Sequence, residues 1–299
     1  MKVYRIEKAL VLGLLLSTSV YGVSMAEDIV ETNKQYSNTS IEADNIYLTY
    51  DENFNSVSPI WISGNVTATN EFTITNTKMD ETKGKGINAY NGAVTVSAKK
   101  IEFNTWDDGI YTTGPQGDDI SGGKKPDVVV KDFDSLNITS THGFGIINNG
   151  NSYRQMISVK NKGDVYITGN EGSIITIQGG YKNNLASDAK AAVKNGLKAS
   201  LVPDNSTDYK TVVSGGTINL TGVGYGTWAE TGQVEIIGKK NTIRAILDER
   251  FKEEYNKSAY TNFGIGVYNQ KDSATTTIKA TDSNVIHGDK EAVKANGGK

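Results

Sequence analysis

The sequence predicts an all-β fold, a right-handed parallel β-helix with three short strands in each rung. A glycine-bounded phrase recurs along the chain, and most copies are followed by a pair of short strands with apolar residues at every second position. Residues 86–114 are the clearest unit: GINAYNG, strands around Val94 and Phe103, then GIYTTG. Alternation with period two places the apolar side chains on one face of an extended backbone. The Gly that closes each phrase suits a corner with positive φ or without a Cβ.

The spacing of the phrase indicates a solenoid. It returns as GIINNG, GSIITIQGG, GTWAETG, GVYNQK and EAVKANGG, and the steps between phrase ends are 22, 36, 29, 53, 39 and 26 residues. Three insertions account for most of the excess: Pro115 to Pro126, Tyr181 to about Val212, and about Ala245 to Asn262. Self-similarity at 20 to 30 residues, with insertions at corners, is typical of stacked repeats. The fixed Leu and Asn pattern of leucine-rich repeats is absent.

Residues 1–26 have the pattern of a secretory signal peptide. Lys2, Arg5 and Lys8 form a basic start, residues 9–23 are apolar, and Ser24-Met25-Ala26 offers small residues before a cleavage site. The apolar run is too short for a membrane span, and no later stretch approaches the ~20 apolar residues that a span requires. We therefore expect an exported chain whose mature form begins at Glu27.

Residues 27–80 are expected to form the entrance and capping rungs of the solenoid. The stretch from Glu27 to about Ile41 is polar and has no clear period, so we expect an irregular start. Strand alternation then appears over residues 41–50 and 60–75. An atypical first rung is expected because a β-helix otherwise leaves a bare backbone edge at its end.

Residues 81–299 are expected to form the main rungs, ending in mid-rung as if truncated. A set of apolar residues in these strands should point inward and stack in columns along one axis: Val94, Val96, Ile101, Phe103, Ile110, Val128, Val130, Ile138, Ile146, Val159 and Ile167. The second and third insertions look helical, with a cap at Ser187 or Asp188 in one, and Leu247, Phe251 and Tyr255 on one face of the other. These two helical insertions either pack against the side of the coil without a binding role or project from it as recognition elements.

Composition excludes several function classes. There is no Cys, so stability has to come from the stacked core. The net charge is -3 with both signs interspersed, which does not provide the basic stripe that nucleic acid requires. His142 and His287 are the only histidines and lie far apart, so we expect no metal site, and no motif indicates a cofactor.

A signal peptide followed by Cys-free, Gly-, Asn- and Thr-rich rungs resembles the passenger domains of autotransporters, which belong to type V secretion. The resemblance covers residues 1–299 and rests on architecture and repeated phrases. It implies display at the surface of a Gram-negative-type bacterium, in the outer membrane or outside the cell, often as an adhesin involved in virulence. The C-terminal translocator barrel of that family is missing from the sequence. Either this chain is a fragment of a longer protein that carries the barrel in cis, or its anchor is a separate chain, and we favour the fragment.

The sharpest enzymatic candidate is Asp107-Asp108 together with His142. Asp108-Gly109 and His142-Gly143 are expected at the same position on consecutive rungs, ~5 Å apart. This partly resembles the paired Asp and Gly-His-Gly of polygalacturonase-type β-helix enzymes, in which two carboxylates act as general acid and base. The chain departs from that pattern, because no Asp occurs in the preceding GKGINAY and no Arg-Ile-Lys follows. A solvated corner is the interpretation we favour for Asp107-Asp108-Gly109.

The sequence therefore predicts a non-enzymatic, surface-displayed passenger that acts as an adhesin or self-association factor. Its partner would be a host or bacterial surface ligand, glycan or protein, or another copy of the chain. A polysaccharide-cleaving enzyme of the polygalacturonase or lyase type and a purely structural stalk are the alternatives.

Overall fold

A computed structural model describes residues 27–61, 63–76, 84–89, 92–113, 128–149, 156–160, 164–169, 172–177, 210–230, 232–247, 263–272 and 274–297. Throughout these ranges the regular structure is β-strand, with no helix. No helix long and apolar enough to cross a membrane occurs in this part of the chain. The predicted all-β class is confirmed.

The strands belong to two sheets. The smaller sheet has the order β2 (Tyr36–Ser37), β4 (Ile60–Trp61), β6 (Ile87–Ala89), β9 (Ile110–Thr113), β12 (Phe144–Asn149), β15 (Gly172–Ile177), β18 (Tyr225–Ala229), β20 (Ile265–Asn269) and β22 (Glu291–Ala295). The larger sheet contains β1 (Ile29–Thr32), β3 (Ile41–Tyr50), β5 (Gly64–Asn76), β7 (Val94–Ser97), β8 (Lys100–Thr105), β10 (Val128–Lys131), β11 (Ser135–Ser140), β13 (Met156–Lys160), β14 (Asp164–Gly169), β16 (Lys210–Ser214), β17 (Thr217–Gly222), β19 (Gly232–Ala245) and β21 (Ala274–Gly288).

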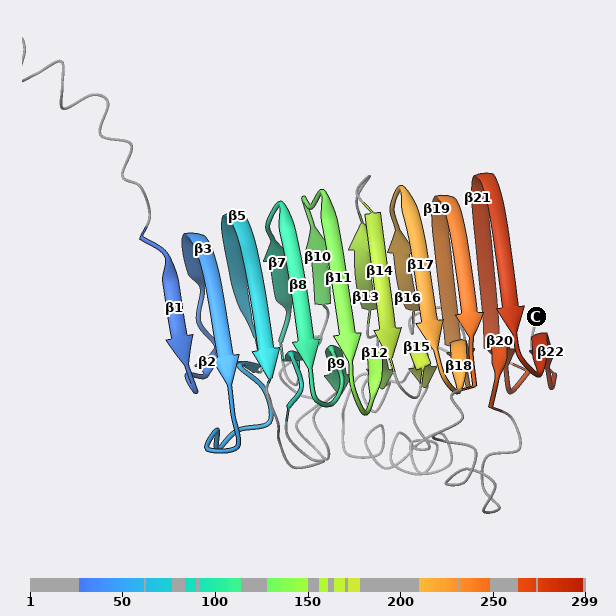
Figure 1. Cartoon of the computed structure of the whole chain (residues 1–299), viewed down its shortest axis with the longest axis horizontal. Coiled ribbons are helices and arrows are strands. Elements are labelled where there is room, and N and C mark those ends of the chain that lie inside the picture. The colour runs from blue at the N-terminus through green and yellow to red at the C-terminus, as the bar shows by residue number, and fades with distance from the viewer. Residues whose placement is uncertain are drawn as a thin grey trace, which may run out of the picture.

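Neighbouring strands pair in parallel, each with its equivalent in the next turn of the chain. The long strands β5 and β19 serve both halves of the larger sheet. The first part of β5 pairs with β7 and its second part with β8, and β19 pairs in the same way with β16 and β17. The larger sheet therefore has two arms that meet at these long strands, and Figure 1 shows the arm of β8, β11, β14 and β17 in front of the arm of β7, β10, β13 and β16. The result is a solenoid-like stack.

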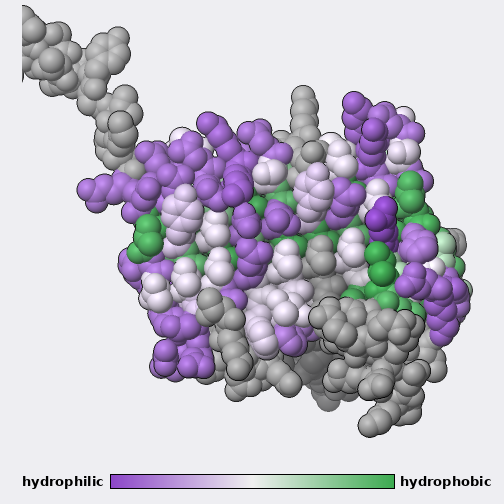
Figure 2. All heavy atoms as spheres, viewed as in Figure 1, coloured by the Kyte–Doolittle hydropathy of each residue, from purple (hydrophilic) through white to green (hydrophobic). Residues whose placement is uncertain are grey.

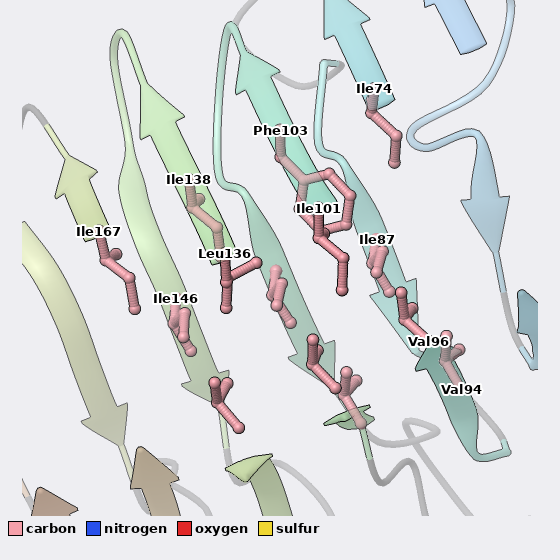
Figure 3. Close-up of a cluster of buried hydrophobic side chains, with 14 of the residues drawn as sticks. Ile74, Ile87, Val94, Val96, Ile101, Phe103, Leu136, Ile138, Ile146 and Ile167 are labelled. Atoms are coloured by element: carbon pink, nitrogen blue, oxygen red, sulfur yellow. The ribbon is translucent and has the colours of Figure 1, made fainter. Parts of the chain in front are cut away.

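The inward columns predicted from the sequence are confirmed. All eleven positions are fully buried. Phe103 pairs with Ile138, and Ile138 pairs with Ile167 on the following strand. Val96, Val130 and Val159 form a second column of this kind. Figure 3 shows Phe103, Ile138 and Ile167 of the first column projecting from strands of successive turns. Parallel pairing produces the columns because each residue lies beside its equivalent one turn later.

The glycine that opens each phrase allows the turns to approach each other closely. A Cβ on Gly109 would lie 2.6 Å from the carbonyl oxygen of Gly145, and one on Gly226 would lie 2.4 Å from that of Gly266. Real side chains cannot tolerate such contacts. The closing glycine behaves as expected at two described corners, because Gly232 has φ +103° and Gly297 has φ +105°.

Two sequence expectations need correction, and two lie outside the described residues. The polar stretch after Glu27 is not irregular, because β1 pairs with β3 and β2 pairs with β4. The insertions are shorter than expected, since Lys210–Val212 lie in β16 and Ala245 ends β19. The two predicted helices fall almost entirely outside the described residues. The signal peptide lies wholly outside them.

Shortening a side chain in an inward column tests this core. Ile138→Ala should lower the free energy of unfolding by about 2 to 4 kcal/mol, because the stacked neighbours on either side cannot close the cavity. Equilibrium denaturation in urea measures the change. Tyr166→Ala, on the outer face of the same arm, is the matched control and should cost less than about 1 kcal/mol. Equal losses for the two variants would contradict the assigned inward and outward faces.

Candidate functional site

A buried cluster of charged residues lies where the chain enters the smaller sheet. Lys85 precedes β6, and Asp107 and Asp108 precede β9 on the next turn. The Gly86 N–H donates to the Asp108 carbonyl (3.0 Å), which fixes Lys85 beside the two acids. The Lys85 ammonium Nζ forms ion pairs with Asp107 Oδ2 and, at 2.6 Å, with Asp108 Oδ2. Their side chains are only 14%, 17% and 5% exposed, respectively.

The cluster is held from the following turn as well. The Phe144 N–H donates to Asp108 Oδ1 (3.0 Å), so Asp108 links three successive turns. The hydroxyls of Thr105 and Ser140 both donate to the Asp107 carbonyl, at 2.8 and 2.7 Å. A Cβ on Gly143 would lie 2.5 Å from Asp108 Oδ1 and 2.7 Å from Asp107 Oδ1. The turn can therefore close over the two carboxylates only because position 143 has no side chain.

Burial and charge act against each other in the cluster. Removal from water raises the pKa of the Asp108 carboxyl to about 6, against the opposing charge of Lys85. Burial also disfavours the charged form of Lys85, but the two neighbouring carboxylates outweigh it and raise the pKa of the ammonium. The aromatic ring of Tyr111 lies 4.6 Å below the Lys85 Nζ and covers it further.

His142 does not stack on Asp108, which corrects the predicted register. The residue opposite Asp108 is Phe144, and the Gly109 N–H donates to its carbonyl (3.0 Å). The His142 N–H instead donates to the Trp106 carbonyl (2.9 Å), and the two rings lie 3.8 Å apart. The step between these turns is two residues longer than the predicted pairing assumed. His142 and Asp108 differ by 34 positions, whereas Ser140 pairs with Thr105 at a step of 35 and Ile146 pairs with Ile110 at a step of 36.

The two carboxylates are arranged as members of an ion-pair cluster and not as the acid and base of an inverting glycosidase. Two oxygens that each lie within 2.6 Å of one nitrogen are at most about 5.2 Å apart. An inverting glycosidase needs its carboxyl groups about 6.5 to 9.5 Å apart, with a water and the sugar between them. Here the Lys85 ammonium occupies that space. The two acids could be identified from the sequence, but Lys85 could not, because a lysine followed by a glycine is not a distinctive motif.

The outer face of the β8, β11, β14 and β17 arm is a second candidate site, also missed from the sequence. One column of this face is rich in threonine and consists of Thr32, Thr49, Thr75, Asn104, Thr139 and Thr221. The backbone of Thr168 lies in register between Thr139 and Thr221. The column beside it contains Tyr47 and Tyr166, the latter 42% exposed. Figure 2 shows pale residues of intermediate hydropathy in a band across this face. The signal was present as Thr-x-Thr and Asn-x-Thr within the strands.

The last rung differs from the inner rungs. Among the described strands β21 pairs only with β19. Ile278 and Ile286 occupy inward positions on β21 but are only partly buried, whereas their partners Ile236 and Ile243 are fully buried. Val293 on β22 is 57% exposed, and its partner Val267 is 3% exposed. This end of the stack thus presents apolar side chains beside an unpaired strand edge.

Within the described residues, no group of three or more His, Cys, Asp or Glu side chains could hold a metal ion. Comparisons with protein-family models, with curated proteins and with solved structures found no match to this chain. The function therefore has to be inferred from the fold, the charged cluster and these two surfaces.

A substitution at Gly143 tests how the cluster is packed. Gly143→Ala should lower the free energy of unfolding by about 1 to 3 kcal/mol, because the new methyl group collides with both carboxylates. His142→Ala, at the exposed neighbouring position, should cost less than about 1 kcal/mol. Urea denaturation of the two variants side by side gives the comparison. A neutral Gly143→Ala would mean that the turn does not close over the acids.

Proposed function

We propose that this chain is an exported, surface-displayed protein of the autotransporter-passenger type, built as a right-handed parallel β-helix with three strands per rung, and that it acts by adhesion. The observation that supports adhesion is the outer face with its threonine column. Equivalent side chains on successive strands repeat at ~4.8 Å, which gives a long, regular surface of hydroxyl and methyl groups. Solenoids commonly bind partners along such extended surfaces.

The ligand we propose for this face is an extended glycan or protein segment at a cell surface. Threonine hydroxyls donate and accept hydrogen bonds, and their methyl groups offer apolar contact. Tyr47 and Tyr166 add aromatic area beside the column. Tyrosine supplies contact area and a polar tip at low entropic cost, which is why it is common in binding surfaces.

The charged cluster gives less support to a polysaccharide-cleaving enzyme. Both carboxylates are ion-paired with the same Lys85 ammonium, and they do not face each other across an open gap. A general acid and base need access to the bond that they cleave. A structural stalk remains consistent with the same rungs, and it differs from an adhesin only in having no ligand.

Self-association is the second role that a specific observation favours. The edge of β21, with Ile278, Ile286 and Val293 beside it, has the character of a surface that adds another strand. Unprotected edges of this kind pair readily with a further strand, either the next rung of a longer chain or a strand of a second copy. In the second case self-association would use the end of the stack, and ligand binding its side.

Binding to immobilised ligands separates these roles. Beads coated with residues 27–299 should adhere to at least one member of a panel of surface glycans and matrix proteins. Thr139→Lys, in the threonine column, should reduce that adhesion severalfold, while Thr67→Lys on the other arm should leave it unchanged. If bead clumping depends on Ile286 and no ligand is bound, self-association is the role. Asp108-dependent release of reducing sugar from pectin would instead support the enzyme.

Export is tested at the N-terminus. Protein recovered from the outside of the producing cell should begin at Glu27, because Ser24-Met25-Ala26 provides the small residues that signal peptidase requires. N-terminal sequencing or intact mass measurement identifies the first residue. Recovered protein that still begins at Met1 would contradict the signal peptide.

A further inference from the structure

Lys85 and its two aspartates form an unusual group in this chain. A primary amine contacts two carboxyl groups from the next turn, and all three side chains are largely removed from water. The Lys100 cluster provides a contrast on the same molecule. Its Nζ lies 2.7 Å from Glu71 and 3.1 Å from Glu102, but its side chain is 52% exposed. We propose that Lys85 and Asp108 condense to an isopeptide bond, a covalent cross-link between two successive rungs.

The condensation balances without any added reagent. The Lys85 Nζ forms a new bond to the Asp108 Cγ, and the bond from Cγ to Oδ2 breaks. The ammonium gives up two protons, which pass to the departing oxygen and leave with it as one water. No group is oxidised or reduced. Nζ already lies 2.6 Å from Oδ2, so the two partners meet as neighbours and no large movement of either strand is needed.

Two surrounding groups match the needs of the attack and of the proton transfer. Attack on Cγ develops negative charge on Asp108 Oδ1, and the Phe144 N–H already points at that oxygen from 3.0 Å. A fixed backbone donor at this position stabilises such a charge. Asp107 contacts the same Nζ and can carry protons from the amine to the leaving oxygen. Its backbone is held by Thr105 and Ser140, which keeps the carboxylate in place.

Burial favours the product over the ion pair. Two charges held out of water are replaced by a neutral amide, which removes the desolvation penalty of both groups. The low exposure of the three side chains also limits the access of water that would hydrolyse the bond. In a chain with no Cys, the cross-link would do what a disulfide does elsewhere, closing the chain between residues 85 and 108. This inference does not depend on the ligand or on adhesion.

Mass spectrometry of the full chain, purified from the cells that produce it, tests the proposal. The denatured wild-type protein should weigh one water less than its sequence predicts from its measured N-terminus. Tandem spectra of a digest should contain a branched peptide that joins Lys85 to Asp108, with no tryptic cleavage after Lys85. Lys85→Arg and Asp108→Ala should restore the full mass, and Asp107→Asn should slow the loss of water. Lys100→Arg is the matched control and should retain the cross-link.

A succinimide at Asp108-Gly109 would also remove one water, so the assignment needs a second criterion. A succinimide opens in mild alkali, survives in Lys85→Arg and joins no second peptide, whereas the isopeptide bond has the opposite properties. Water loss that persists in Lys85→Arg, or a wild-type chain at full mass without a branched peptide, overturns the proposal. The branched peptide is sought in the wild type itself, so the outcome does not depend on how well any variant folds.

Discussion

Parallel pairing between successive turns is the constraint on which the rest of this structure depends. It places every residue beside its equivalent one turn earlier and one turn later, so a single inward position becomes a column. Isoleucine, valine and phenylalanine fill the columns of Phe103 and Val96. The same constraint applies to the backbone at the corner before each strand of the smaller sheet. There Gly109 and Gly226 are needed because a carbonyl of the next turn occupies the space of a Cβ.

The charged cluster uses the same stacking for another purpose. Lys85, Asp108 and Phe144 come from three successive turns, and register alone brings them together. Burying two carboxylates beside one ammonium is costly unless the geometry is good and the remaining lone pairs are satisfied. Here the backbone N–H of Phe144 satisfies Asp108, and Gly143 leaves room for both acids. Such a cluster ties the turns together as an ion pair, and more firmly once it becomes an amide.

The outside of the stack is divided into surfaces with different properties. The outer face of the β8, β11, β14 and β17 arm repeats threonine, asparagine and tyrosine at the spacing of the strands, which suits an extended partner. The end at β21 presents apolar residues and an unpaired edge, which suits another strand. The Lys85 cluster contributes to neither surface, since its side chains are largely removed from water and the following turn closes over them. Binding and internal cohesion are therefore assigned to different residues.

The sequence by itself determined the all-β class and the inward columns, because alternation and a recurring glycine phrase are local signals that each turn repeats. Val94, Ile138 and Ile167 could be assigned to the core for that reason. Tertiary structure alone decided what meets across the turns. The step between the turns is 35 residues at the Thr105 and Ser140 pair and 36 at the Ile110 and Ile146 pair, so Phe144, and not His142, lies opposite Asp108. Lys85 has no local signal that predicts its partners, since its neighbours in space lie a full turn away. The opening glycines likewise reveal their purpose only when the carbonyl of the next turn is in place.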